Sequence, residues 1–188
     1  VGIIRISGSQ AFPIIDKIFE NKSKGFINKE SHKAFLGTLH DREGKILDEA
    51  LVLIFKGPRS YTGEDTVEIH SHGNPFILKE TLKEIVSLGA RKSQRGEFTR
   101  QAFLNGNLDL TQSEAILDTI EAGSRKALEM SLNQLEGSLS HKIGTLKEEL
   151  ISMTAYLEAS IDFPDDELDF TYTTEVLKER TSHILEEI

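Results

Sequence analysis

The hydrophobic and polar positions of the first 110 residues predict short strands and helices in alternation. Four segments have the apolar character or the period of two that is typical of strands: residues 1–6, 34–40, 46–55 and 65–72. A glycine-bearing turn at residues 41–45 joins the second segment to the third, which predicts a β-hairpin. The first strand begins without an initiator methionine, so we expect the natural polypeptide to extend upstream.

Three helices are predicted between and after these strands: residues 9–20, 74–89 and 97–104. Ser9 can cap the first helix, whereas Asn74 caps the second and a glycine ends it. Strands and helices in this order predict an α+β fold, in which a mixed sheet forms a layered domain over residues 1–110.

Beyond residue 110 the period changes to that of helices, and we expect a second domain segment, entirely α-helical, at residues 111–188. Thr111 and Glu114 form a predicted capping box for a helix that ends near Ala122. One long helix is predicted over residues 125–160, with a length of about 50 Å at about 1.5 Å per residue.

Apolar residues recur three or four positions apart along this long helix, and we call the row the apolar seam. Its members are Leu128, Leu132, Leu135, Leu139, Ile143, Leu146, Leu150, Met153, Leu157 and Ile161. A seam of this length requires partner helices. We therefore expect the chain to self-associate or to expose apolar surface here.

Composition and charge narrow the classes of function. The chain has 188 residues, no cysteine and a formal net charge of −9, which excludes disulfides and argues against nucleic-acid binding by overall charge. No apolar run is long enough for a membrane span or a secretory signal, which predicts a cytoplasmic protein with no membrane partner. The one basic cluster is either a nucleic-acid contact or a solvated surface, and its members are Arg91, Lys92, Arg95 and Arg100.

Acidic and histidine side chains offer one candidate metal site. Glu68, His70 and His72 share one side of an extended strand. A carboxylate and two imidazoles suit zinc or iron, although three successive positions on a flat strand do not readily converge on one ion. A metal-dependent hydrolase is therefore an alternative function. A second acidic stretch, residues 163–170, is interpreted as a structural connection rather than a Mg²⁺ site.

Three motifs resemble one known family. They are QRGEFTRQAFLNGNLDLTQSEA at residues 94–115, SYTGED at residues 60–65 and FPDDE at residues 163–167. Together they resemble the N-terminal half of the MnmE (TrmE) family of bacterial tRNA-modifying GTPases, and the resemblance covers nearly the whole chain. It implies a folate-binding domain like that of glycine-cleavage T-proteins, followed by the first part of a helical domain.

A phosphate-binding loop of the form G-x-x-x-x-G-K followed by Ser or Thr is absent from the sequence. In the MnmE family the GTPase domain is inserted into the helical domain, so the resemblance implies a fragment that cannot hydrolyse GTP alone. For the intact protein it implies GTP hydrolysis with Mg²⁺ and K⁺. Such a protein forms a homodimer through its N-terminal domain. With the flavoprotein MnmG it adds a carboxymethylaminomethyl or aminomethyl group to C5 of uridine 34 in tRNA.

The resemblance also implies a ligand, 5-formyltetrahydrofolate, and three residues that bind it: Arg5, Glu68 and Asn107. A pterin ring presents N–H donors that Glu68 can accept, and the tail of the folate is anionic. Arg5 lies in an otherwise apolar strand and needs an anion, either the folate carboxylate or an internal acidic side chain. Asn107 stands where some members have lysine, so it donates a hydrogen bond without a charge.

The loop at residues 60–65 borders the same strand, where Tyr61 can stack on a flat ring or serve as a packing residue, and Thr62 can bond to the ligand. A further alternative needs no ligand at all. In it the chain is a purely structural dimer scaffold.

Overall fold

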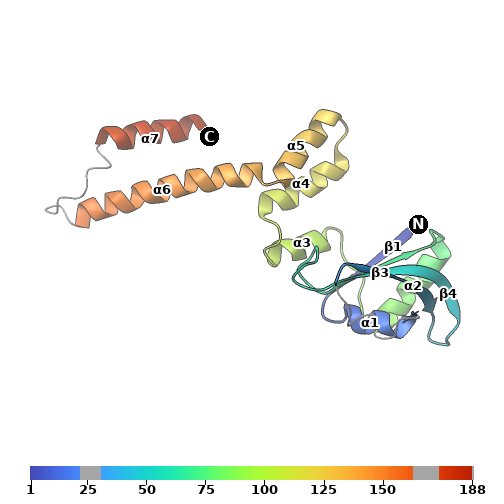
Figure 1. Cartoon of the computed structure of the whole chain (residues 1–188). Coiled ribbons are helices and arrows are strands. Elements are labelled where there is room, and N and C mark those ends of the chain that lie inside the picture. The colour runs from blue at the N-terminus through green and yellow to red at the C-terminus, as the bar shows by residue number, and fades with distance from the viewer. Residues whose placement is uncertain (22–30, 163–173, 188) are drawn as a thin grey trace. The chain divides into compact units, whose positions relative to one another are not determined.

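The computed structural model describes residues 1–21, 31–162 and 174–187. The chain forms two compact units, Val1–Ser113 and Glu114–Ile188. Each unit has its own secondary structure, and the first carries the sheet (Figure 1).

A five-stranded sheet organises the first unit. In spatial order its strands are β1 (Gly2–Ser7), β5 (Thr66–Ser71), β4 (Ile46–Phe55), β3 (Lys33–His40) and β2 (Phe19–Glu20). Every neighbouring pair is antiparallel.

The predicted α+β class and the β3–β4 hairpin are confirmed, whereas the predicted mixed sheet is wrong. The reason lies in the strand order. β1, β4 and β2 run in one direction and β5 and β3 in the other, and the two sets alternate across the sheet. No parallel pair therefore forms among the described strands.

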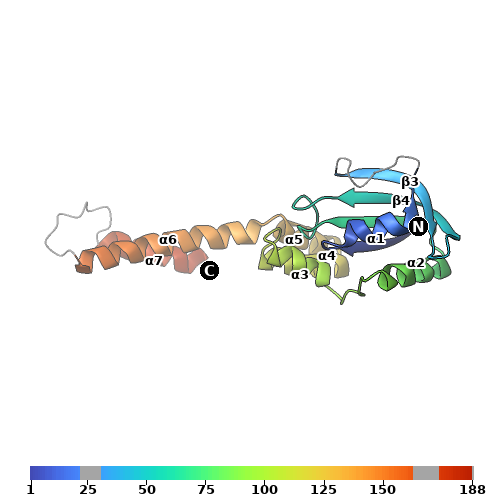
Figure 2. The same cartoon turned by 90° about the horizontal axis from the view of Figure 1, so that it is seen from below.

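Two helices, α1 (Ala11–Ile18) and α2 (Pro75–Ser87), pack against one face of the sheet (Figures 1 and 2). α1 contacts β5 and α2, while α2 contacts β1 and β4. Alternate strand residues meet them and are fully buried: Val52, Ile54, Val67 and Ile69. Each such side chain contributes about 1.5–3 kcal/mol by burial, so this face fixes the register of the sheet.

α2 begins and ends as predicted. The Asn74 side chain accepts a hydrogen bond from the backbone N of Phe76 at 2.8 Å, and Gly89 follows the helix at a φ of +110°. The short helix α3 (Glu97–Leu104) likewise ends before a left-handed glycine, Gly106. In all three places local residue chemistry decides where the helix begins or ends.

The predicted Ser9 cap on α1 is wrong. No side chain caps this helix, and the backbone N of Ala11 donates to the O of Gly8 at 3.0 Å. Gly8 has a φ of +121°, which makes a turn that includes Ser9 before the helix starts.

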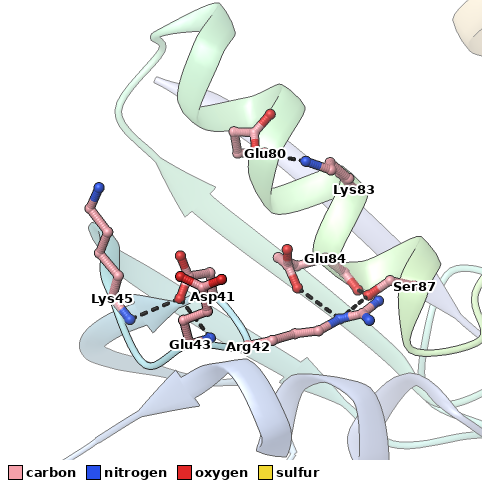
Figure 3. A network of polar contacts seen from close by, with 8 residues as sticks. All are labelled: Asp41, Arg42, Glu43, Lys45, Glu80, Lys83, Glu84 and Ser87. Atoms are coloured by element: carbon pink, nitrogen blue, oxygen red, sulfur yellow. Dashed lines mark hydrogen bonds and ion pairs between the residues drawn. The ribbon is translucent and has the colours of Figure 1, made fainter.

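The β3–β4 turn is fastened to α2 by a polar network (Figure 3). Within the turn, the Asp41 side chain accepts a hydrogen bond from the backbone N of Lys45 at 2.8 Å. The Arg42 Nε donates to Ser87 Oγ at 2.9 Å and lies 3.3 Å from Glu84 Oε2. These contacts join the far end of the hairpin to the helix that covers the sheet.

The second unit begins within α4 (Leu110–Glu121), whose capping differs from the prediction. The Asp109 side chain accepts from the backbone N of Gln112 at 2.8 Å, and the Gln112 side chain accepts from the backbone N of Asp109 at 3.0 Å. The capping box is therefore Asp109 with Gln112, not Thr111 with Glu114. Asp is a stronger N-cap than Thr, and Thr111 Oγ1 itself donates to Asp109 at 2.8 Å.

Residues 125–160 do not form the single helix that was predicted. They form α5 (Arg125–Leu135) and α6 (Ser138–Asp162), which contact each other. Gly137 separates them at a φ of +89°, a left-handed position that ends a helix even where the apolar period continues. α7 (Thr174–Glu187) follows, and the acidic stretch at 163–170 lies outside the described residues.

The apolar seam remains partly exposed after the break. Leu132, Ile143, Leu150 and Leu157 all retain substantial exposed surface, which agrees with the expected exposure of apolar surface here. Three members of the row, Ile143, Leu146 and Leu150, line a groove of about 530 Å³ along α6. None of the described helices is both long enough and apolar enough to cross a membrane.

Replacing Gly137 by Ala should lower the free energy of unfolding by about 1–2 kcal/mol, because a β-carbon is strained in the left-handed region. Gly144→Ala is the matched control in α6, where an added β-carbon meets no atom within 4 Å. It should raise the free energy of unfolding by about 0.5–1 kcal/mol through helix propensity. Urea denaturation followed by circular dichroism measures both. Equal effects of the two variants would contradict the assigned break.

Candidate functional site

Arg5 and Glu68 face each other across the β1–β5 pair. The Nε and Nη2 of Arg5 each lie 2.9 Å from Glu68 Oε1, and the side chains are 39% and 18% exposed. Glu68 Oε2 lies 3.2 Å from His70 Nε2. Two of the three predicted binding residues, Arg5 and Glu68, thus lie together. Glu68 is the internal acidic side chain that pairs with the charge of Arg5.

Two aromatic rings flank the Arg5 guanidinium. Its central carbon lies 5.6 Å from the ring centroid of Tyr61 and 5.4 Å from that of Phe98. Cation–π attraction at these distances stabilises the guanidinium. Tyr61 is fixed in turn, because its hydroxyl lies 2.9 Å from Thr99 Oγ1. A positive group between flat rings is a suitable surface for an anionic or aromatic ligand.

Asn107, the third predicted binding residue, holds the loop that carries Tyr61. Its Nδ2 donates to the backbone O of Ser60 at 2.9 Å and of Tyr61 at 3.3 Å. Asn105 Nδ2 donates to the backbone O of Thr62 at 2.6 Å. Asn107 is therefore connected to Arg5 through Tyr61 rather than by direct contact.

A cluster of hydroxyls lies beside this loop. Ser7 Oγ lies 2.6 Å from Thr62 Oγ1 and donates to Glu64 Oε2 at 3.0 Å. Thr66 Oγ1 lies 3.4 Å from Ser7 Oγ. Thr62 is 0% exposed, and its hydroxyl contacts Ser7 and Thr66 within this cluster.

A cavity of about 600 Å³ opens beside β1 in the first unit. Arg5, Glu64 and Phe98 line it, whereas Glu68 and Asn107 do not. Binding pockets for small molecules typically enclose about 300–1,000 Å³. Of the three predicted binding residues, only Arg5 both belongs to the ion pair and lines the cavity.

The basic cluster at residues 91–100 is partly neutralised. Arg91 makes an ion pair with Glu97, whose carboxylate also accepts from the backbone N of Gln94 at 2.7 Å. The Arg91 hydrogen bond, followed by that of Gln94, lowers the pKa of Glu97 to about 2. The other three members of the cluster, Lys92, Arg95 and Arg100, are exposed.

The predicted metal set of Glu68, His70 and His72 does not converge. His72 lies just beyond the end of β5, and its Nδ1 is 2.8 Å from Asp48 Oδ1. Burial acts to raise the pKa of Asp48, but hydrogen bonds from the backbone and side chain of His72 outweigh it and lower the pKa. Within the described ranges, no three histidine or acidic side chains lie close enough to hold a metal ion.

Comparison with known proteins identifies the family. A sequence model described as GTP-binding protein TrmE N-terminus matches residues 1–107, and one described as MnmE helical domain matches residues 110–188. The chain belongs to the MnmE (TrmE) family. The resemblance indicated by its sequence motifs is confirmed.

Several relatives named tRNA modification GTPase MnmE are similar to this chain. That of Alkaliphilus oremlandii is 45% identical over 171 residues, or 90% of this chain and 37% of the relative. That of Legionella pneumophila strain Corby is 46% identical over 170 residues, with the same two shares. That of Aquifex aeolicus is 42% identical over all 188 residues of this chain, which correspond to 41% of the relative. The chain thus spans about two fifths of the length of these MnmE relatives.

Sequence reasoning missed two features of this MnmE-family site. Phe98 lies in the most distinctive motif, but no local signal links it to Arg5, which is distant in the chain. Glu64 lies in a quoted motif, yet its place in a cavity follows from the loop conformation. The contact between His70 and Glu68 was not missed, since strand alternation predicts both side chains on one face.

Replacing Arg91 by Ala should raise the pKa of Glu97 from about 2 toward 4.5, because the ionised carboxylate loses its main hydrogen-bond donor. The pKa is lowered in the folded chain. The contribution of the pair to stability is therefore present above about pH 4.5 and is lost as the pH falls toward 2. An NMR pH titration of the Glu97 carboxyl carbon measures this pKa.

Arg95→Ala is the control for this titration. Arg95 lies in the same loop, but the lowering of the Glu97 pKa comes from Arg91, Gln94 and Arg100. The midpoint should stay near 2 in this variant. An unchanged midpoint in the Arg91 variant would show that the ion pair does not form in solution.

Proposed function

We propose that this chain is the reduced-folate-binding part of a tRNA modification GTPase. The observation that carries the proposal is the Arg5–Glu68 ion pair, whose guanidinium lies over the rings of Tyr61 and Phe98 and borders a cavity of about 600 Å³. A reduced folate combines a ring rich in N–H donors with an anionic tail. A site with a cation, a carboxylate and aromatic faces provides a partner for each of these parts.

In this proposal the ligand is 5-formyltetrahydrofolate, and Arg5, Glu68 and Asn107 each have a part in binding it. Arg5 supplies positive charge. Glu68 Oε1 already takes both contacts from Arg5, while Oε2 takes one from His70 and keeps a lone-pair direction for a ligand N–H. Asn107 holds the Tyr61 loop against the site.

The intact protein, on the same proposal, acts on tRNA. The relatives named tRNA modification GTPase support this extension. We propose that it hydrolyses GTP with Mg²⁺ and K⁺ in the cytoplasm, and that it modifies uridine 34 of tRNA together with MnmG. The GTP site would lie outside this chain, whose sequence contains no loop of the form G-x-x-x-x-G-K.

The open face of the sheet supports homodimerisation through the first unit. Strand register aligns Ile3, His70, Leu51 and Leu36 in one row across β1, β5, β4 and β3. The three aliphatic members of this row are 56%, 43% and 58% exposed, in the order Ile3, Leu51, Leu36. Exposed aliphatic side chains on neighbouring strands of one sheet face are typical of an interaction surface.

Titration of 5-formyltetrahydrofolate into the chain should give saturable binding. Arg5→Ala and Glu68→Ala should each raise Kd by about tenfold or more, because a hydrogen bond to a charged group contributes about 1.5–3 kcal/mol. Isothermal titration calorimetry measures Kd. Matched controls come from the exposed Arg125–Glu129 pair of α5, where Arg125→Ala and Glu129→Ala should leave Kd unchanged.

Three other outcomes, from this titration together with metal analysis and light scattering, would reject the proposed function or the proposed site. Absence of binding with stoichiometric zinc or iron in the purified protein would indicate the metal-dependent hydrolase. If the chain neither binds the folate nor contains zinc or iron, but forms a stable dimer by light scattering, the structural scaffold would be indicated. Binding that survives both alanine variants would assign the ligand to another surface.

A further inference from the structure

The cavity beside β1 contains one carboxylate oxygen that is still open. Among the acidic residues around it, Glu97 is occupied by Arg91 and by the backbone N of Gln94. Glu68 is engaged by Arg5 and His70 and does not line the cavity. Glu64 lines the cavity, and its Oε1 accepts no hydrogen bond from any described residue.

The direction of the Glu64 side chain is fixed by its other oxygen. Oε2 accepts from Ser7 Oγ at 3.0 Å, and Ser7 Oγ in turn lies 2.6 Å from Thr62 Oγ1. The backbone N of Glu64 donates to the same Thr62 hydroxyl at 3.3 Å. Because Thr62 is fully buried, this support is part of the folded core and holds Glu64 in place without a ligand.

The space in front of Glu64 is open and otherwise suited to a flat ring. Gly8 borders it, and a β-carbon there would lie 4.0 Å from Glu64 Oε2. Ile4, Leu82 and Phe98 provide apolar and aromatic walls. Lys92 lines the same cavity and adds positive charge. An open acceptor, apolar walls and a cation together suit a ligand with an N–H edge and an anionic end.

We infer that Glu64 is a further ligand-binding carboxylate, which accepts hydrogen bonds from the amino-pyrimidine edge of the bound ring. This inference rests on the proposed function and names the chemistry that the cavity recognises. A carboxylate and an amino-pyrimidine edge make a two-point contact in which both donors are on the ligand. Glu64 Oε1 takes one of these donors, and Oε2, which accepts one hydrogen bond from Ser7, has a second lone-pair direction for the other.

The test uses two ligands and one conservative variant. The ligands are 5-formyltetrahydrofolate and its 2-desamino analogue, in which a hydrogen replaces the exocyclic amine. Glu64→Gln keeps the shape of the side chain and an acceptor for Ser7, but it can present an amide N–H to the ligand edge. Glu43→Gln, in the β3–β4 turn outside the cavity, is the matched control.

The wild-type chain and the Glu43 variant should bind the amino ligand at least about tenfold more tightly than the analogue, as expected for a hydrogen bond to a charged acceptor. In Glu64→Gln this ratio should fall to about 1. A general loss of folding weakens both ligands equally and leaves the ratio unchanged. The ratio therefore reports the contact itself, and calorimetry measures it.

An unchanged ratio in Glu64→Gln, with binding retained, overturns the role of Glu64 while the proposed function stands. No binding of either ligand by the wild-type chain rejects the proposed function, and the inference with it. A ratio near 1 in the wild-type chain overturns the inference directly, because no acceptor then recognises the amine.

Discussion

The candidate site depends on one interaction, the ion pair between Arg5 on the edge strand β1 and Glu68 on β5. A guanidinium in an otherwise apolar strand requires an anion, and the antiparallel register puts a carboxylate directly opposite it. Tyr61 and Phe98 then flank the charge and limit its freedom. If the register slipped by one residue, Glu68 would turn to the buried face and the arrangement would be lost.

That register is held by parts of the unit distant from the site. Alternate residues of the central strands are buried under α1 and α2, and Arg42 fastens the β3–β4 turn to α2. On the other side, Asn105 and Asn107 hold the loop at 60–63 through its backbone carbonyls. The ion pair of this MnmE-family chain thus lies apart from the buried side chains that fix the register. This separation allows a preformed site at low cost in rotamer freedom.

Local patterns predicted much of the fold, since strand alternation and helix ends are decided by neighbouring residues. Asn74 and Gly89 bound α2 as expected. The errors arose where two local signals competed: Gly137 ended a helix that the apolar seam favoured, and Asp109 capped α4 in place of Thr111. Antiparallel pairing throughout and the position of Phe98 beside Arg5 depend on tertiary contacts that no local pattern contains. For Arg5 the sequence left two kinds of partner open, a folate carboxylate or an internal acidic side chain, and in the structure its partner is Glu68.

The most direct test of this account is a double-mutant cycle on affinity for 5-formyltetrahydrofolate. Kd is measured for the wild-type chain, Arg5→Ala, Glu68→Ala and the double variant. The account predicts that the two losses are not additive, with a coupling of at least about 0.5 kcal/mol, because each residue orients the other. Strict additivity would contradict it, since the two residues would then act on the ligand independently.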